Sequence, residues 1–299
     1  MSSRLAFLSW LKWSHGASHP LPGVATRGAP FQPTRHAMAM SAARREVVTL
    51  DCTGTIMRIK GSISRLYLGV LEERLGIDEG GIPGVCEQAL LDTFQASIKR
   101  RSQELPCFGA GVMSSEEWWA DVVRTAFLGA GVPEESLKGV FDEVFDHLFH
   151  HVFTRGPAWE LVPGAKGVIS DLRAWCQEEG GPLALGAVSN FDERLHPLLQ
   201  NLGVYDLFDF VLTSRECGSQ KPDPHIFREA LKRAGAREAD GVGLHIGDSF
   251  GKDVLGARGV GWDSFLITQK DPSDGEKNVR HVRVGELTDV PVALGIARR

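Results

Sequence analysis

Five short apolar segments, separated by turns or by stretches with helical periodicity, constrain the fold of this chain more than any other feature. Each is four to six residues long, which is short for a helix but ordinary for a strand. Strands that alternate with helices in this way are typical of an open, largely parallel sheet with helices on both faces. The sequence therefore predicts a doubly wound α/β core, with strands at Val47–Leu50, Leu183–Val188, Phe210–Thr213, Gly243–Ile246 and Ser264–Ile267.

The long interval between the first two of these strands shows helical periodicity and no convincing strand. Apolar side chains recur at helical spacing throughout it, and Ser114 with Glu117 forms a capping-box pattern ahead of one apolar stripe. We therefore expect residues 61–158 to form a helical cap. It would be inserted into a core of residues 46–60 and 159–299, over the edge of the sheet where the ligand is expected.

The first 45 residues differ from the rest of the chain because they carry six basic residues and no acidic one. The stretch from Leu5 to Trp13 could form a short amphipathic helix, but its apolar part is too short for a signal-peptide core or a membrane span. This composition favours a mitochondrial or plastid presequence. The alternatives are a disordered extension, or translation that starts at Met38 or Met40, which would leave the protein in the cytoplasm or nucleus.

Residues 46–299 carry 27 basic against 38 acidic side chains, a formal charge of −11. An acidic body of this kind argues against nucleic acid as a partner. No segment approaches the roughly 18 consecutive apolar residues of a membrane helix, so we expect a soluble protein with no membrane partner. The five cysteines are scattered without a CxxC pair and predict neither a zinc site nor a disulfide framework.

Polar residues follow the ends of the predicted strands, at the edge where open α/β sheets bind ligands. Asp51 follows the first strand, and its carboxylate is able to attack phosphorus and form a covalent intermediate. Ser189 and Asn190 follow the second strand, and the hydroxyl of Ser189 can donate to a phosphoryl oxygen. Lys221 supplies a positive charge for Asp51 and for the phosphoryl group. Taken singly, each could be an ordinary turn, cap or surface residue; their order along the chain favours a phosphoryl-transfer site.

Asp248 and Asp253 predict a metal site. Mg²⁺ prefers oxygen ligands and is commonly held by one or two carboxylates. The pair Gly247-Asp248 ends the fourth predicted strand, which would bring that carboxylate beside Asp51, and Asp253 lies one helical turn further on. Asp253 would ligate the ion or orient the site. The alternative for Asp253 is a first-turn acid that is favoured by the helix dipole.

These motifs resemble those of the haloacid dehalogenase superfamily, whose members are mostly phosphatases, and in particular its subfamily with a helical cap. The most specific stretch comprises Ser214, Glu216, Gly218, Lys221-Pro222-Asp223-Pro224 and Ile226-Phe227. The resemblance excludes only the N-terminal segment and the C-terminal tail. It implies a Rossmann-like core with an inserted helical cap, and a cap that opens and closes over the substrate.

The resemblance also implies roles for the residues that match the motifs. Asp51 would be the nucleophile and Thr55 would orient it by a hydrogen bond. Substrate would be bound by Ser189, Asn190 and Lys221. The ligands of Mg²⁺ would be Asp51, the backbone carbonyl of Thr53, Asp248 and Asp253.

Thr53 departs from the phosphatase pattern, in which an aspartate two residues after the nucleophile protonates the leaving group and later activates water. A threonine hydroxyl does not do this near neutral pH, and the loss of a general acid/base costs roughly 10²–10⁴ in rate. We therefore expect a slow, Mg²⁺-dependent phosphatase of a small phosphorylated metabolite, acting through an aspartyl-phosphate. The alternatives are a haloacid-type dehalogenase, or an impaired module that binds a phosphate ligand or a protein. A dehalogenase needs no metal, so Asp248 and Asp253 favour the phosphatase.

Overall fold

The computed structural model describes residues 45–77, 81–155, 158–237, 239 and 241–296. Its main sheet has the strand order β5-β4-β1-β6-β7-β8, and all the neighbouring strands are parallel. The predicted doubly wound α/β core is therefore confirmed. The strands are β1 (Val47–Leu50), β4 (Ala184–Ser189), β5 (Phe210–Thr213), β6 (Gly243–Gly247), β7 (Asp263–Ile267) and β8 (Val282–Val284).

The central strand β1 is hydrogen-bonded on both sides, with Val47 opposite Ala184 of β4 and Gly243 of β6. All four of its side chains are buried, which explains why its apolar residues are not confined to alternate positions. In the strand order, β1 lies between β4 and β6, so the residues that follow these three strands meet at one edge of the sheet.

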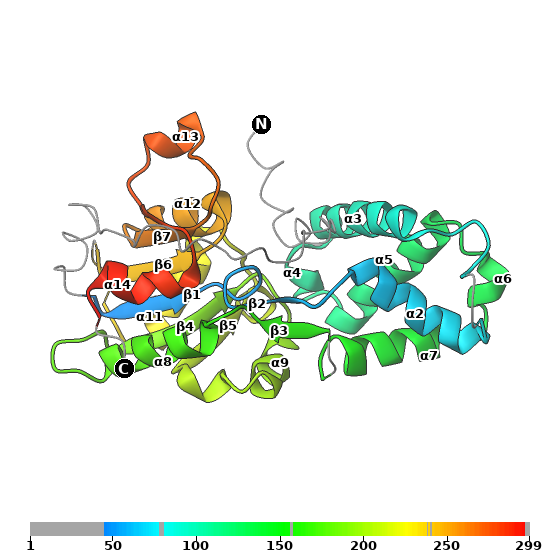
Figure 1. Cartoon of the computed structure of the whole chain (residues 1–299), viewed down its shortest axis with the longest axis horizontal. Coiled ribbons are helices and arrows are strands. Elements are labelled where there is room, and N and C mark those ends of the chain that lie inside the picture. Colours follow the sequence, from blue (N-terminus) through cyan, green and yellow to red (C-terminus); the bar gives the residue numbers. More distant parts are fainter. Residues whose placement is uncertain (1–44, 78–80, 156–157, 238, 240, 297–299) are drawn as a thin grey trace, which may run out of the picture.

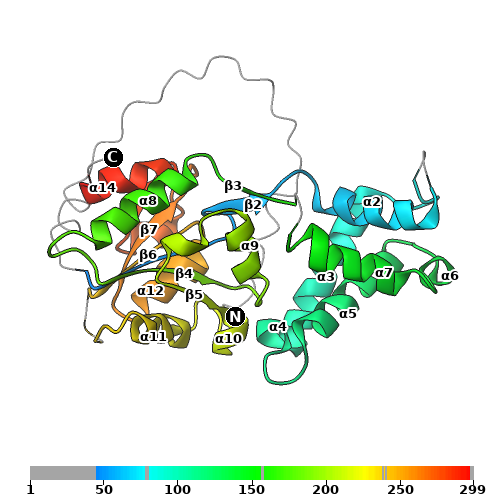
Figure 2. The same cartoon turned by 90° about the horizontal axis from the view of Figure 1, so that it is seen from below.

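Helices cover both faces of the sheet (Figure 2). One face packs against α8, α9 and α14, and the opposite face packs against α11 and α12. The core helices are α8 (Ala165–Cys176), α9 (Leu195–Asn201), α10 (Ser214–Cys217), α11 (Pro224–Arg233), α12 (Leu255–Arg258), α13 (Asp274–Lys277) and α14 (Val290–Leu294). Shorter helical turns are η2 (Tyr205–Leu207), η3 (Phe250–Val254) and η4 (Leu287–Asp289), of which η3 is a π-helical turn.

A separate group of helices lies beside the sheet, on the right in Figure 1. The chain leaves the core through β2 (Met57–Ile59) and returns through β3 (Trp159–Leu161), and these two strands pair antiparallel as a stem. The segment between them contains α2 (Ile63–Leu75), α3 (Glu87–Glu104), α4 (Pro106–Gly109), α5 (Ser115–Gly129), α6 (Glu134–Leu137), α7 (Phe141–Asp146) and η1 (His147–Val152). We call this segment the cap.

The long cap helices α3 and α5 pack against each other, and Thr93 of α3 donates to the Ala126 carbonyl of α5 at 2.9 Å. The start of α5 carries the predicted capping box. The Ser114 side chain accepts from the Glu117 N–H, and the Glu117 carboxylate accepts from the Ser114 N–H. None of the helices among the described residues is both long and apolar enough to cross a membrane.

The sequence analysis missed β2, β3 and β8, each only three residues long, and placed some strand ends one residue away from their position in the structure. The predicted presequence lies outside the described residues except for its last residue, Arg45. Arg45 packs against the core, where its guanidinium pairs with the Asp263 carboxylate at 2.5 Å.

Candidate active site

The predicted site residues meet at the carboxyl edge of the main sheet. Asp51 directly follows β1, Ser189 ends β4, and Asp248 directly follows β6. Lys221 comes from the loop before α11, and Asp253 lies in the π-helical turn η3. Single π-helical turns of this kind are often found at functional sites.

Lys221 is the electrostatic centre of the site. Its side chain is almost fully buried, and its Nζ lies 2.7 Å from Asp51 Oδ1 and 2.7 Å from Asp253 Oδ1. Burial alone would lower the pKa of this lysine, but the two carboxylates outweigh that effect and raise the pKa above its ordinary value. Lys221 is therefore a cation at neutral pH.

Asn190 fixes the backbone of Lys221. Its side-chain amide donates to the Lys221 carbonyl at 2.9 Å and accepts from the Lys221 N–H at 2.7 Å. The sequence analysis assigned Asn190 to the substrate; in the structure both of its polar atoms contact the backbone of Lys221, and Asn190 also lines the cleft described below. The helix α11 that follows is capped by Asp223, whose side chain accepts from the His225 N–H.

Asp253 is held from three directions. Its Oδ1 contacts Lys221 and lies 3.1 Å from His245 Nε2, and its Oδ2 accepts from the Ser249 N–H at 2.8 Å. Burial alone would raise the pKa of Asp253, but Lys221 and His245 hold it well below its ordinary value. The other ring nitrogen of His245 lies 2.7 Å from the Thr49 hydroxyl, which fixes the orientation of the ring.

Asp248 has the opposite environment. Its Oδ1 is buried and has no hydrogen-bond partner in the described part of the chain. Burial, together with the carboxylates of Asp51 and Asp253, raises the pKa of Asp248 to about 8. These three residues each offer an oxygen within 4.8 Å of the others. An unpaired carboxylate beside two others is what a bound divalent cation would stabilise, so the donor set fits Mg²⁺.

Two glycines let the carboxylates approach the backbone. Gly54 has a φ of +88°, and a Cβ on it would lie 2.6 Å from Asp248 Oδ2. A Cβ on Gly247 would lie 2.3 Å from the carboxyl carbon of Asp253. Any other residue at either position would push a candidate metal ligand away from Asp51.

Thr55 does not form the predicted contact with Asp51. Thr55 is fully buried, and its hydroxyl has no partner among the described residues, so the hydrogen bond expected between Thr55 and Asp51 is absent. Lys221 contacts Asp51 instead. The Thr53 hydroxyl is also buried without a partner within the described chain, and Thr53 forms an isolated bridge with Met57.

Ser189 is buried at the end of β4, where it hydrogen-bonds the thiol of Cys52. Burial, followed by the charge of Asp51, raises the pKa of Cys52 well above its ordinary value. Cys52 is therefore a packed, protonated thiol. The histidines at positions 147, 150 and 151 do not form a metal cluster within the described residues.

A cleft that is partly open to solvent lies between the cap and the core beside these residues. On the core side it is lined by Asn190, Phe191, Asp192, Gln220 and Lys252, and on the cap side by Ile98, Ser102, Cys107, Phe108 and Trp119. Burial lowers the pKa of Lys252, although the neighbouring carboxylates oppose that effect.

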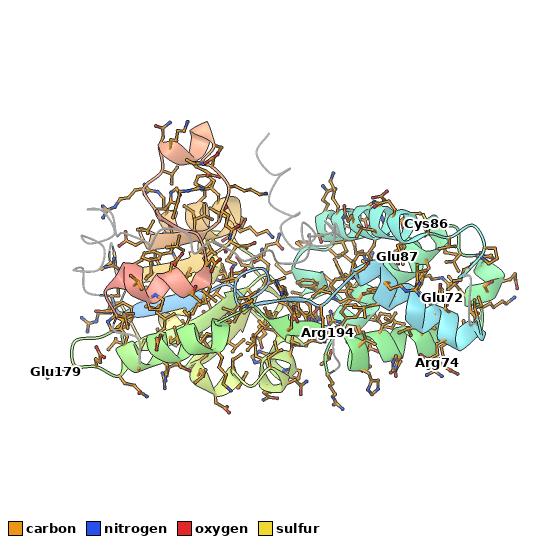
Figure 3. The ribbon with its side chains drawn as sticks, in the orientation of Figure 1. Glu72, Arg74, Cys86, Glu87, Glu179 and Arg194 are labelled. Carbon is orange, nitrogen blue, oxygen red and sulfur yellow. The ribbon has the colours of Figure 1, made fainter. Side chains whose placement is uncertain are left out.

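Cap and core also meet through Asp192 and Arg194. The Trp119 indole of the cap donates to the buried Asp192 carboxylate at 2.7 Å, and Arg194 pairs with the same carboxylate at 2.7 Å. The Arg194 guanidinium lies 4.0 Å from the centre of the Phe149 ring of the cap. Figure 3 labels Arg194 where the core meets the cap. Nothing in the sequence around Trp119 identified Asp192, 73 residues further on, as its partner.

The family model for haloacid dehalogenase-like hydrolases matches residues 46–261. The chain belongs to the haloacid dehalogenase-like hydrolases. It is 38% identical over 229 residues to the Bos taurus haloacid dehalogenase-like hydrolase domain-containing protein 3, covering 76% of this chain and 84% of that protein.

Two solved structures show the same fold at lower sequence identity. One is a 2-haloacid dehalogenase from Pseudomonas syringae pv. Tomato (TM-score 0.56, 22% identity, 84% of this chain and 98% of that chain). The other is a haloacid dehalogenase-like phosphatase from Thermococcus onnurineus (TM-score 0.52, 21% identity, 85% of this chain and 100% of that chain). Because one neighbour is a dehalogenase and the other a phosphatase, the fold alone does not choose between the two reactions for this hydrolase.

Proposed function

We propose that this hydrolase is a Mg²⁺-dependent phosphatase that acts on a small phosphate monoester through an aspartyl-phosphate on Asp51. The observation that carries the proposal is the unpaired buried oxygen of Asp248, which lies among the carboxylates of Asp51 and Asp253. A site built for a carboxylate-bearing haloacid has no need of this third negative charge.

The charges in the site support a divalent cation. Three carboxylates, from Asp51, Asp248 and Asp253, face the two ammonium groups of Lys221 and Lys252. Once Asp248 loses its proton, the entry of a phosphate dianion would leave this site with an excess of three negative charges. Bound Mg²⁺ would remove two of them and polarise the phosphoryl group.

Residues of the chain would supply the nucleophile, stabilise the transferred group and position the lysine. Asp51 is buried at the strand end, where a carboxylate oxygen can attack the phosphorus as the bond to the leaving oxygen breaks. Lys221 holds the other oxygen of Asp51 and stabilises charge on the transferred group. Asn190 and Asp253 keep Lys221 in place, and His245 keeps Asp253 in place.

Thr53 makes turnover slow in this proposal. The position lacks a side chain able to protonate the leaving oxygen and then activate water, so both proton transfers fall to solvent or to the substrate. Its backbone carbonyl remains available as a metal ligand, because that role does not depend on the side chain.

The test is phosphate release by the full chain from a panel of phosphate monoesters and one aryl phosphate, with Mg²⁺ or with a chelator. Asp51→Asn is the matched control because it keeps the shape of the side chain and removes the nucleophilic charge. We expect Mg²⁺-dependent release that the control abolishes.

The same panel includes a 2-haloacid, with halide release as the readout. Halide release that a chelator does not affect, together with no phosphate release, would replace the phosphatase by a dehalogenase. If the folded protein releases neither product, the proposed enzyme activity is wrong, and the site is better described as a binding module.

A further inference from the structure

The cap presents a backbone turn of unusual conformation to the cleft. Cys107 has φ and ψ of 51° and 39°, and Phe108 has 57° and 35°, so two successive residues other than glycine are left-handed. This conformation is unfavourable for residues with a Cβ, and it persists only where the surrounding structure enforces it. Both side chains line the cleft.

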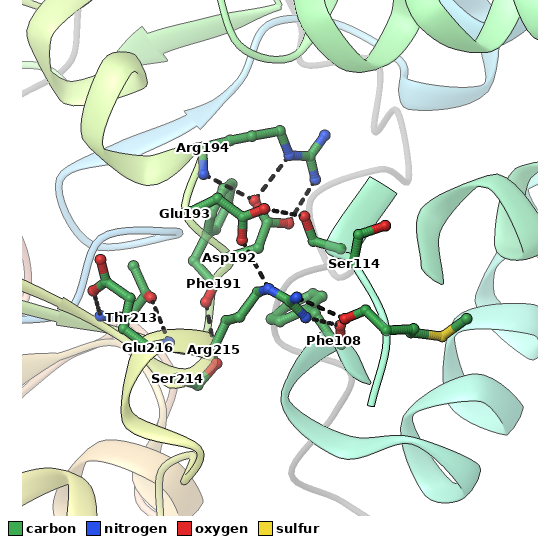
Figure 4. Close-up of polar contacts among 12 residues, drawn as sticks. Phe108, Ser114, Phe191, Asp192, Glu193, Arg194, Thr213, Ser214, Arg215 and Glu216 are labelled. Carbon is green, nitrogen blue, oxygen red and sulfur yellow. Dashed lines mark hydrogen bonds and ion pairs between the residues drawn. The ribbon is translucent and has the colours of Figure 1, made fainter. Parts of the chain in front are cut away.

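The enforcing residue is Arg215, which belongs to α10 of the core and not to the cap. Its guanidinium donates to the Phe108 carbonyl and, at 2.7 Å, to the carbonyl of Met113, so it holds the turn at Phe108 and the segment that follows it (Figure 4). Its Nε lies 3.0 Å from Glu193 of the core, and Glu193 in turn accepts from the Ser115 hydroxyl at the start of α5.

The ring of Phe108 is positioned as part of an aromatic wall. It packs edge-on against Trp118 at a centroid distance of 5.2 Å and is stacked with Trp119 at 5.9 Å. Together with Ile98, this wall gives the cap side of the cleft an apolar surface on which Ser102 is the main polar group.

Asp192, which lines the cleft beside this wall, already accepts four hydrogen bonds from Trp119 and Arg194. Asn190 donates one hydrogen bond to the Lys221 carbonyl and accepts one from the Lys221 N–H. The wall therefore offers little to the hydroxyls of a sugar, whereas flat apolar groups pack well against aromatic rings.

We propose that Arg215 positions Phe108 on the wall of the cleft, and that this makes the hydrolase selective for phosphate monoesters with an aromatic or other planar apolar body. The selectivity rests on the proposed phosphatase function. Because Arg215 reaches from the core to the cap, the wall is complete only when the two parts are in contact.

The experiment measures binding separately from turnover, so that the two proposals can fail independently. Calorimetry with Mg²⁺ compares phenylphosphonate with methylphosphonate, which carry the same anionic group and are not hydrolysed. Wild type should bind phenylphosphonate at least about 10-fold more tightly, a ratio in the range that apolar pockets achieve. Phosphate release from phenyl phosphate, glucose 6-phosphate and acetyl phosphate is then measured on the same proteins.

Three variants and one control test the positioning role. Arg215→Met and Phe108→Ala should each reduce the phenyl-to-methyl binding ratio several-fold and raise KM for phenyl phosphate, while the values for acetyl phosphate change little. Arg215→Lys should behave like Arg215→Met, because a single ammonium does not reproduce the fork that holds two carbonyls. Arg124→Met is the control: it removes an arginine of the cap that also has a carboxylate partner, Glu134, but lies outside the cleft, and it should leave the ratio unchanged.

A wild-type protein that binds neither phosphonate, or binds both equally, would overturn the proposal. So would folded Arg215→Met and Phe108→Ala proteins that keep the wild-type ratio, or that lose activity on acetyl phosphate as much as on phenyl phosphate. A third result is that wild type prefers phenylphosphonate and the variants lose that preference, while no protein releases phosphate from any of the three compounds. That result would support the selectivity and reject the phosphatase.

Discussion

Replacing Asp248 with asparagine should stabilise the metal-free protein. An oxygen of Asp248 lies within 4.8 Å of oxygens of Asp51 and Asp253. Its Oδ1 is buried without a hydrogen-bond partner in the described chain. Asparagine has nearly the same shape and carries no charge, so the substitution removes the repulsion and leaves the packing intact. Stabilisation by the loss of a charged residue would show that the carboxylate is present for a bound cation and not for the fold.

The magnitude follows from the raised pKa of Asp248, about 8 in place of the ordinary 3.8. Between these values the folded protein holds a proton that the unfolded chain releases, so the free energy of unfolding falls as pH rises. At about 1.4 kcal/mol per pH unit, the cost near pH 7 is at most ~4 kcal/mol. Asp248 is only half-buried, so water screens part of the effect, and we expect a gain of about 1–3 kcal/mol.

The assay is urea denaturation of wild type and Asp248→Asn in chelator, at several pH values from 4 to 8.5. The stability difference should be small near pH 4 and should grow toward pH 8. Saturating Mg²⁺ should stabilise wild type, by ~2.7 kcal/mol at a concentration 100 times Kd, and should do little for the variant.

Asp253→Asn is the matched control with the opposite expected sign. The pKa of Asp253 is held below its ordinary value by Lys221 and His245 against the effect of burial, so its charge stabilises the fold and its removal should destabilise it. An Asp248→Asn protein that is no more stable than wild type at pH 8, or a gain that does not vary with pH, would refute the electrostatic reasoning.

Three further substitutions have definite expected outcomes. Lys221→Met leaves the buried carboxylates of Asp51 and Asp253 without their shared cation. Urea denaturation should show a free energy of unfolding lower by about 3–5 kcal/mol. A loss below about 1 kcal/mol would contradict the buried ion pairs. Thr53→Asp should raise the rate of phosphate release by roughly 10²–10⁴; no gain in a folded protein that still binds Mg²⁺ would mean that this position does not limit turnover. Gly54→Ala would place a Cβ 2.6 Å from Asp248 Oδ2, at a residue whose backbone is left-handed. Calorimetry should show that the affinity for Mg²⁺ falls about 10- to 100-fold. An unchanged affinity would exclude Asp248 as a ligand.

The central strands were predictable because burial on both faces makes them visible as apolar runs. Val47–Leu50 is buried throughout and needs no information from its neighbours to be read as a strand. The stem strands Met57–Ile59 and Trp159–Leu161 give no such signal. Each is three residues long, and their pairing depends on the cap bringing together positions about 100 residues apart.

The site was predictable as a set of residues but not as a set of contacts. Motif order identified Asp51, Lys221, Asp248 and Asp253, which the structure brings together. The role of Asn190 as a clamp on the lysine backbone depends on how two loops pack, and sequence spacing does not encode that. The left-handed turn in the cap was equally hidden, because neither of its two residues is glycine or asparagine, the residues that normally indicate this conformation.

Thr53 changes the electrostatics of this site as well as its acid/base chemistry. It lies two residues after Asp51 and next to Gly54, which abuts Asp248, and its own hydroxyl is buried without a partner among the described residues. An aspartate there would add a fourth carboxylate to a site in which Asp248 already retains its proton up to a pH of about 8. Thr53→Asp should therefore be less stable than wild type in chelator and recover in Mg²⁺, and its gain in rate should require the metal. A gain that persists in chelator would show that the site supports acid/base catalysis without a cation.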